Sequence, residues 1–302
     1  MPDPRAAFYG DDFTGSVDAL LQFARRGWTG RLFVGLPDAA TLRQAAEVAD
    51  VVGIAGIARS LPTEALDAEL APVFDALRSL NPRIVQYKAC STADSSPTIG
   101  SLGRVAELGR THVSPGVVPM LFAQPSFGRY TLFGHHFAAE NGTVYRLDRQ
   151  PTMSTHPSTP MTESDLAVHI SHQTELDIRS VPFTDYGSAD AAFRALRDTP
   201  ADAVVLDARD DTDLEVVGAA IAALEPPVFA IGSGGLSHAI AAAAPGDADD
   251  LPKTAPGGGP VLAVSGSRSA LTRRQVDAAA AEGWLSIPLP LAPEAANPSS
   301  SR

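Results

Sequence analysis

The feature that most constrains the fold of this 302-residue chain is a regular alternation of short apolar runs with amphipathic segments. The runs predict buried strands at residues 6–10, 31–36, 51–56, 83–88, 178–183, 203–208 and 228–235. Strands that alternate with helices favour a mostly parallel sheet flanked by helices on both faces. The predicted fold class is therefore α/β, with a Rossmann-like N-terminal domain whose site lies in the turns after the carboxyl ends of the strands.

The first predicted helix, residues 16–27, shows the amphipathic pattern clearly. Its apolar residues Val17, Leu20, Leu21 and Ala24 fall on one helical face. We expect that face to be the buried one.

The middle of the chain departs from the alternating rhythm. Asn141 and Gly142 lie between two extended runs, which predicts a β-hairpin. A further helix is predicted to begin at Thr162 as its N-cap, with Asp165 three residues later.

Composition divides the chain into three parts. Residues 245–259 are rich in Gly, Pro and Asp, which predicts a linker after a first domain of residues 1–244. Residues 260–302 contain a predicted strand and turn at 260–267 and a helix at 270–283. About 43 residues are marginal for an independent core. This part therefore depends on the first domain or on a partner subunit of a homo-oligomer.

The charge balance restricts the partners. A net charge of −12 argues against nonspecific nucleic-acid binding, which needs Lys and Arg to neutralise phosphates. The first residues lack the apolar core of a signal peptide, and no segment of about 18 apolar residues would span a membrane. We therefore expect a cytoplasmic protein. The single cysteine, Cys90, excludes a disulfide framework or a thiolate zinc site within one chain.

Two acids stand at the carboxyl end of the first predicted strand. Asp11 and Asp12 are followed closely by Thr14 and Gly15. A carboxylate beside a helix N-terminus is held ionised by backbone N–H groups and the helix dipole. It can accept a hydroxyl proton, hydrogen-bond a polyol or hold Mg²⁺. The alternative is that Asp12 or Thr14 only caps the helix.

Lys88 ends the fourth predicted strand and supplies a fixed cation. Hydroxyls and a carboxylate follow it, from Ser91, Thr92, Asp94 and Ser95. This set suits a small, anionic, hydroxylated ligand. The alternative is a Ser/Thr turn that opens a helix.

A loop after the predicted hairpin is too long to be a mere connector. It contains Arg146, Asp148, Arg149 and His156. Two arginines can bind a carboxylate or a phosphate in a bidentate manner.

The histidines give only a weak indication of metal. The spacing of His135, His136 and His156 matches no standard zinc motif. His169 and His172 lie three positions apart on the predicted helix and are expected at the surface.

Two glycine-rich turns follow apolar runs and precede helices. They contain Gly232, Ser233 and Gly234, and Ser265, Gly266 and Ser267. Backbone amides at such a helix start favour phosphate. Neither turn matches a P-loop or a dinucleotide fingerprint, and the missing fingerprint argues against a Rossmann-like dehydrogenase.

In their order along the chain, these segments resemble the four-carbon acid sugar kinase family. The resemblance rests on "DDFTGS", "YKACSTADSSPTIG", "GRYTLFGHHF", "YRLDRQPTMSTHPSTPMTESDL", "VVLDARDDTDL", "FAIGSGGL" and "VSGSRSALTRRQ". Members phosphorylate acids such as threonate, erythronate and 3-oxo-tetronate, with a substrate-binding N-terminal domain and a nucleotide-binding C-terminal domain. The resemblance implies a four-carbon sugar acid as substrate, with ATP and Mg²⁺ as cofactors.

The resemblance also implies roles for individual residues. Asp12 would accept the proton of the substrate hydroxyl or orient it, and Asp11 would hold Mg²⁺ or a hydroxyl pair. Lys88 and Arg149 would neutralise the substrate carboxylate or the transferring phosphoryl group. The implied substrate-binding residues are Thr14, Gly15, Ser91, Thr92, Asp94, Ser95, Arg146, Asp148, Arg149 and His156. The implied nucleotide-binding residues are Gly232, Ser233, Gly234, Ser265, Gly266 and Ser267.

The end of the chain departs from the family. Members continue into a further glycine-rich nucleotide-binding segment, whereas this sequence ends in a stretch rich in Pro and Ser. We therefore expect residues 260–302 to be an incomplete second α/β nucleotide-binding domain. Two functions follow, either an ATP-dependent sugar-acid kinase or a sugar-acid-binding remnant without turnover.

Overall fold

The computed structural model describes residues 4–247, 259–266 and 270–288. The chain divides into two compact units, Met1–Pro252 and Lys253–Arg302. The predicted domain boundaries at 244 and 259 remain predictions, because the predicted linker falls largely on residues 248–258, outside the described residues.

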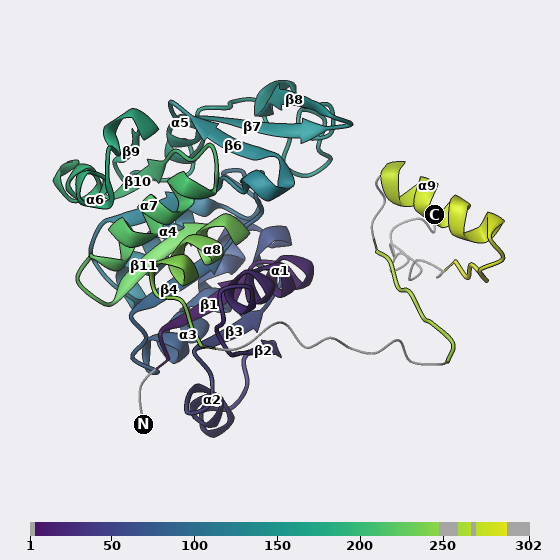
Figure 1. Cartoon of the computed structure of the whole chain (residues 1–302), viewed down its shortest axis with the longest axis horizontal. Coiled ribbons are helices and arrows are strands. Elements are labelled where there is room, and N and C mark those ends of the chain that lie inside the picture. Colours follow the sequence, from purple (N-terminus) through teal and green to yellow (C-terminus); the bar gives the residue numbers. More distant parts are fainter. Residues whose placement is uncertain (1–3, 248–258, 267–269, 289–302) are drawn as a thin grey trace, which may run out of the picture. The chain divides into compact units, whose positions relative to one another are not determined.

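An eight-stranded sheet forms the centre of the first unit, in the order β2-β3-β1-β4-β11-β5-β10-β9 (Figure 1). Every neighbouring pair is parallel. The strands are β1 (Ala6–Gly10), β2 (Gly30–Val34), β3 (Val51–Ala55), β4 (Ile84–Lys88), β5 (Val118–Leu121), β9 (Ile178–Val181), β10 (Ala203–Leu206) and β11 (Val228–Gly232). The predicted α/β class and all seven predicted strands of this sheet are confirmed. β5 was not predicted.

Helices cover both faces of the sheet. One hydrophobic cluster joins the sheet to α2 (Ala39–Ala46), α3 (Leu66–Arg78), α4 (Leu102–His112) and α5 (Leu166–Ser171). The other joins it to α1 (Phe13–Ala24), α6 (Ala189–Asp198), α7 (Asp211–Ala222) and α8 (Gly234–Ala243).

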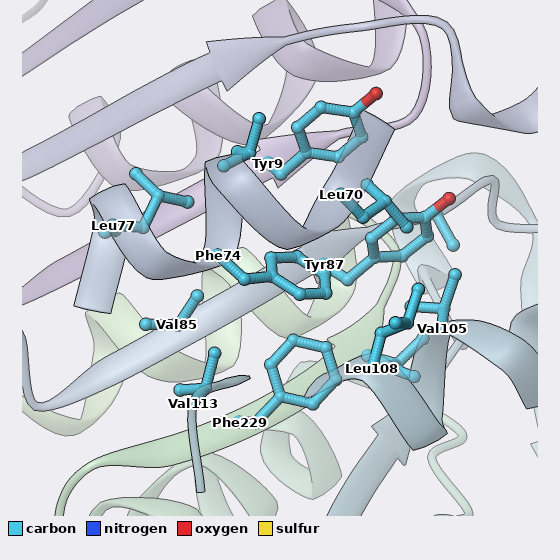
Figure 2. Packing of buried hydrophobic residues seen from close by; sticks show 14 of the residues in the cluster. Tyr9, Leu70, Phe74, Leu77, Val85, Tyr87, Val105, Leu108, Val113 and Phe229 are labelled. Atoms are coloured by element: carbon cyan, nitrogen blue, oxygen red, sulfur yellow. The ribbon is translucent and has the colours of Figure 1, made fainter. Parts of the chain in front are cut away.

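Aromatic side chains of the first cluster pack against one another between the sheet and its helices (Figure 2). Tyr9 and Tyr87 stack with ring centroids 5.8 Å apart, and Phe74 meets Phe229 edge-on at 5.2 Å. Because β1, β4 and β11 lie side by side with both faces covered, their carboxyl ends are held rigidly next to one another.

A small antiparallel sheet is inserted between β5 and β9. It contains β6 (Arg129–Leu132), β7 (His135–Glu140) and β8 (Thr143–Arg146). Asn141 and Gly142 have φ of 49° and 80° between β7 and β8, so the predicted hairpin is confirmed.

The buried carboxylate of Asp207 joins this small sheet to the main one. It follows β10 and accepts hydrogen bonds from the backbone N–H groups of Phe133, Gly134 and Phe183 at 2.5, 3.0 and 3.3 Å. The small sheet is therefore attached at the carboxyl edge of the main sheet.

Two helix predictions were wrong in detail. The buried residues of α1 are Ser16, Ala19, Gln22 and Phe23, whereas Val17 is 58% exposed. The face toward the sheet is partly polar because it meets charged groups at the sheet edge. α5 is capped by Asp165, which accepts hydrogen bonds from the amides of residues 167 and 168, instead of by Thr162.

The strand predicted at 260–267 is also wrong for the described part, 260–266, which has neither helix nor strand. Val261, Leu262 and Val264 are more than 70% exposed there. An apolar run becomes a strand only when a neighbouring strand pairs with its backbone groups. α9 (Ala270–Ala281) confirms the last predicted helix.

We predict that Gly109→Ala destabilises the protein, although Ala normally favours a helix. A Cβ atom at Gly109 in α4 would lie 1.9 Å from the buried ring of Phe229. Overpacking of this kind costs about 1–3 kcal/mol. Gly116→Ala is the control, because its Cβ would meet only Ser114 Oγ at 3.5 Å. Urea unfolding of both variants tests this, and equal midpoints would contradict it.

Candidate functional site

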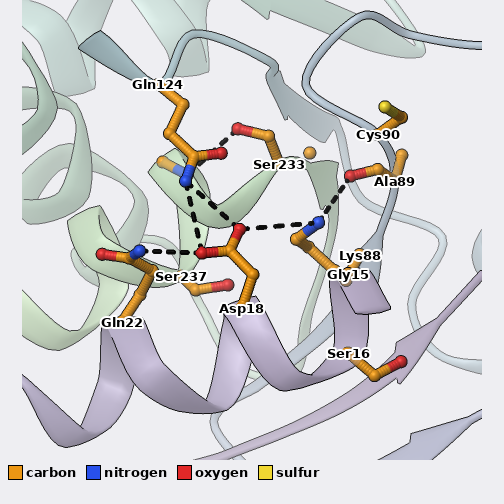
Figure 3. Close-up of polar contacts among 12 residues, drawn as sticks. Gly15, Ser16, Asp18, Gln22, Lys88, Ala89, Cys90, Gln124, Ser233 and Ser237 are labelled. Carbon is orange, nitrogen blue, oxygen red and sulfur yellow. Dashed lines mark hydrogen bonds and ion pairs between the residues drawn. The ribbon is translucent and has the colours of Figure 1, made fainter. Parts of the chain in front are cut away.

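Three of the predicted turns meet at one point of the sheet edge. In the strand register, Lys88 of β4 is the partner of Gly10 in β1 and of Gly232 in β11. Asp11 and Ser233 follow those two glycines directly. The sequence therefore brings an acid pair, a lysine and a glycine-rich helix start together, as Figure 3 shows in part.

Asp12 caps helix α1. Its Oδ1 accepts a hydrogen bond from the Gly15 amide at 2.7 Å. Gly15 allows a close approach here, because a Cβ atom would lie 2.4 Å from Asp12 Oδ1 and 3.1 Å from Lys88 Nζ. The capping alternative is thus observed, while a catalytic role for Asp12 remains a prediction. Thr14 is exposed beside it.

Arg59, which follows β3, binds both acids of the pair. Its Nε and Nη2 donate to Asp11 at 3.1 and 2.6 Å, and its Nη1 donates to Asp12 Oδ2 at 2.9 Å. Burial raises the pKa of the Asp11 carboxyl above its usual range, and Arg59 and Lys88 oppose that rise. Each oxygen of the two carboxylates therefore already accepts a hydrogen bond.

Lys88 is a buried cation, 3% exposed. Its Nζ donates to the carbonyl oxygen of Ala89 at 2.9 Å and lies 4.0 Å from Asp18 Oδ2. An ammonium has three N–H donors. These contacts leave donor capacity for a negatively charged ligand.

Asp18 lies on the inner face of α1, close to the start of α8. Its carboxylate accepts from Gln22 Nε2 at 2.9 Å and from Gln124 Nε2 at 3.2 and 3.4 Å (Figure 3). A Cβ atom at Gly234 would lie 2.2 Å from Asp18 Oδ2, so only glycine allows this approach.

Sequence reasoning missed Arg59, Asp18 and Gln124. Arg59 follows a correctly predicted strand, so the sheet-edge rule alone would have found it. Asp18 was missed because the wrong face of α1 was taken as buried. Gln124 follows β5, which was not predicted.

The segment after Lys88 is held by internal hydrogen bonds. Thr92 Oγ1 donates to Asp94 Oδ1 at 2.5 Å, and Ser95 Oγ donates to the Ala93 carbonyl at 2.9 Å. Ser91 supplies its backbone carbonyl to His136 Nε2 at 2.8 Å. The hydroxyls of Thr92 and Ser95 therefore already have local partners, and their role in substrate binding remains a prediction.

Two histidines next to this segment are buried. Burial lowers the pKa of His136 to about 4. The expectation that His169 lies at the surface is wrong, since it is 9% exposed and its Nε2 contacts Ser95 Oγ at 3.0 Å. Burial, with His172 nearby, lowers the pKa of His169 to about 4. His172 is exposed as expected.

The two arginines that were predicted to bind a ligand lie beside a carboxylate of the protein itself. Arg146 binds Asp148 through Nε and Nη2, both at 2.6 Å. Arg149 lies 3.9 Å from Asp148 with its side chain 75% exposed. His156 Nδ1 accepts a hydrogen bond from the Thr159 amide at 3.1 Å. Of these groups, the Arg149 guanidinium is the most accessible to a ligand.

The predicted nucleotide side is described in part. Ser233 caps α8 by accepting from the Gly235 amide at 3.0 Å. A pocket of about 100 Å³ adjoins this helix start and is lined by residues that include Gln22, Gln124 and Gly234. Residues 265 and 266 are exposed and lie outside helices and strands, and residue 267 lies outside the described residues.

Within the described residues, no group of three acidic, histidine or cysteine side chains forms a metal site. Both oxygens of Asp11 accept hydrogen bonds from Arg59, so this carboxylate does not fit the predicted role of a Mg²⁺ ligand. No helix among these residues is long and apolar enough to cross a membrane.

A larger pocket lies elsewhere. It has about 490 Å³ and is lined by residues at the amino ends of the strands, including Arg5, Trp28, Arg83 and Pro227. Ligands of open parallel sheets bind at the opposite edge. We therefore place the candidate site at the Lys88 cluster, defined as Asp11, Asp12, Asp18, Arg59 and Lys88.

Residues 6–240 match the family described as the sugar-binding N-terminal domain. A 3-oxo-isoapionate kinase from Paraburkholderia graminis is 39% identical over 286 residues, 92% of this chain and 60% of that kinase. A 3-oxo-tetronate kinase from Pseudomonas fluorescens is 33% identical, over 96% of this chain and 68% of that kinase. A domain from Bordetella bronchiseptica, solved as a domain-swapped dimer with bound citrate, has a TM-score of 0.65 at 25% identity, over 79% of this chain and 55% of that chain.

The chain belongs to this sugar-binding family, and its resemblance to the four-carbon acid sugar kinases is confirmed. It spans about three fifths of the length of the first relative and two thirds of the second.

We predict that His169 makes stability fall as the solution becomes acidic. With a folded-state pKa of about 4, the unfolded chain binds the proton first, so the free energy of unfolding falls from about pH 6.5 to pH 4. Over this pH range the free energy of unfolding falls by about 3 kcal/mol. His169→Gln should remove that part of the slope in urea unfolding at several pH values, and the exposed His172→Gln should not. Parallel curves for all three proteins would contradict this.

Proposed function

We propose that this chain binds a four-carbon sugar acid at the Lys88 cluster and takes part in its ATP-dependent phosphorylation. The observation that carries the proposal is the buried Lys88 ammonium with donor capacity left for an anion, next to the amino ends of α1 and α8. The kinase names of the relatives and the citrate bound to the Bordetella domain support a hydroxylated, carboxylate-bearing ligand.

Catalysis of phosphoryl transfer consists mostly of positioning and charge stabilisation. Lys88 would neutralise the transferring phosphoryl group, and the accessible Arg149 would bind the substrate carboxylate. Asp12, held by Arg59, would orient the substrate hydroxyl. Gly232, Ser233 and Gly234 would face the phosphates of ATP.

Mg²⁺ would enter with ATP, mainly through the phosphate oxygens. Asp11 binds Arg59 through both of its oxygens and is therefore not a ligand of this Mg²⁺. We also propose that the protein acts in the cytoplasm and does not bind nucleic acid.

Sugar-acid binding without turnover is the second candidate function. One observation favours it. The described part of the predicted phosphate turn, Ser265 and Gly266, is exposed and lies outside helices and strands. Calorimetric titration with a tetronate, and separately with ATP and Mg²⁺, distinguishes the two functions. Tetronate binding without ATP binding or product formation would favour the second.

We predict that tetronates raise the melting temperature and that neutral tetritols do so much less. The carboxylate needs a charged partner, and a ligand at 100 times its Kd stabilises by about 2.7 kcal/mol. D-Threonate and threitol at equal concentration make the comparison by differential scanning fluorimetry. Arg149→Met should remove most of the tetronate shift, because its exposed guanidinium is available to the carboxylate, whereas Arg179→Met, at a surface ion pair, should keep it. Equal shifts with both ligands would refute the charged site.

We predict that Asp12→Asn lowers kcat/KM for phosphoryl transfer by at least about 100-fold, because the amide can still cap α1 but cannot balance the charge of Arg59, so the site loses its geometry. Asp38→Asn is a matched control, since Asp38 caps α2 by accepting from the Ala40 and Thr41 amides. An activity within a fewfold of the parent would show that Asp12 acts only as a helix cap. Asp11→Asn, assayed in parallel, tests the opposite assignment of the two acids.

A further inference from the structure

We propose that Asp18, and not Asp11 or Asp12, is the carboxylate that accepts the proton of the substrate's terminal hydroxyl. This inference rests on the proposed kinase function and assigns a catalytic residue within the same site. The two adjacent acids then serve as positioning residues, held by Arg59.

The first step of the argument is that Asp11 and Asp12 are engaged. Arg59 donates three charge-assisted hydrogen bonds to them, at 2.6, 2.9 and 3.1 Å. The remaining oxygen, Asp12 Oδ1, accepts from the Gly15 amide at 2.7 Å. These bonds occupy all four oxygens of the acid pair, so a substrate hydroxyl would have to compete with the Arg59 cation and the helix start for them.

The carboxylate of Asp18 differs from these two in its hydrogen-bond donors. Its hydrogen-bond donors are the neutral amides of Gln22 and Gln124, at 2.9 to 3.4 Å. The nearby cation, Lys88, is 4.0 Å away, beyond hydrogen-bonding distance. The Asp18 side chain is also 16% exposed, compared with 3% for Asp11, so a ligand can reach it.

The surroundings of Asp18 suit the reacting atoms. Lys88 is next to it for negative charge, and the glycines at 15 and 234 let two helix starts approach Lys88 Nζ and Asp18 Oδ2 closely, where a Cβ atom would lie 3.1 and 2.2 Å away. The start of α8 adjoins the pocket of about 100 Å³. A hydroxyl at Asp18 would therefore lie beside a cation and a helix start that both favour a phosphoryl group.

The proposed step balances in atoms and charge. The hydroxyl oxygen forms a bond to the γ-phosphorus of ATP, and its proton passes to a carboxylate oxygen of Asp18. The bond between the γ-phosphorus and the bridging oxygen breaks, and its electron pair leaves with ADP. Lys88 stabilises the negative charge on the phosphoryl oxygens.

A binding experiment tests the contact without any need for turnover. D-Threonate is compared by calorimetry with the 2,3-dihydroxybutyrate of the same configuration, which lacks the terminal hydroxyl. We expect the parent to prefer threonate by about 10- to 100-fold, because a hydrogen bond to a charged acceptor is lost in the analogue. Asp18→Ala should abolish this preference, whereas Asp12→Ala should weaken both ligands and keep it.

Each outcome is decisive. A preference that survives in Asp18→Ala, or is lost only in Asp12→Ala, overturns the assignment of Asp18 and leaves the proposed function intact. Equal binding of both ligands by the parent also overturns the assignment. If the parent binds neither ligand, the proposed function fails, and this inference fails with it. Asp18→Asn, of the same shape, serves in the same titrations if Asp18→Ala does not fold.

Turnover gives a second readout. Asp18→Asn should lower kcat for threonate phosphorylation by about 10²- to 10⁴-fold, the usual contribution of a general base. The KM values for threonate and ATP should stay within a fewfold of the parent, because Asp18 acts in the chemical step. A kcat near that of the parent would overturn the proposal.

Discussion

The burial of the Lys88 ammonium at the centre of the sheet's carboxyl edge is the interaction on which the site depends. A charge removed from water costs several kcal/mol unless opposite charges and hydrogen bonds compensate it. Here the Ala89 carbonyl and the Asp18 carboxylate provide that compensation, and Asp11 lies near enough to interact electrostatically. In the strand register Lys88 lies between Gly10 and Gly232, where a Cβ atom would meet Ser16 Oγ at 1.9 Å and the Leu121 carbonyl oxygen at 2.1 Å, so the helix starts and strands around Lys88 are closely packed.

The acid pair at the start of α1 has a structural consequence of its own. Two carboxylates side by side repel each other, and Arg59 offsets this by bridging them from the end of β3. The bridge fixes the turn after β1 to the turn after β3, so α1 begins in a defined direction. That direction brings Asp18, one turn and a half along the helix, to Lys88. The local sequence motif thus also helps to place a residue that lies outside the motif.

Much of this could be predicted from the sequence, within limits that have physical causes. Apolar runs locate the strands, because a strand that is buried on both faces is apolar throughout. The rule that sites lie at the carboxyl edge of a parallel sheet then places Asp11, Asp12, Lys88 and Ser233 together. The buried face of helix α1 could not be predicted from its apolar residues, because a helix that faces a charged cluster buries polar residues. The apolar run at 260–266 did not predict its structure either, because strand formation depends on a partner that no local pattern specifies.

The charges of the Lys88 cluster also limit how a ligand can lie in it. Three carboxylates face two cations, so the cluster carries a net formal charge of −1 before any ligand binds. The hydroxyl end of a sugar acid is compatible with that surplus, because carboxylates accept hydrogen bonds. The acid end is repelled by it and needs cations outside the cluster, of which the exposed Arg149 guanidinium is one. Electrostatics alone therefore favours an orientation with the hydroxyl toward the aspartates, which is the orientation that phosphorylation of a hydroxyl requires.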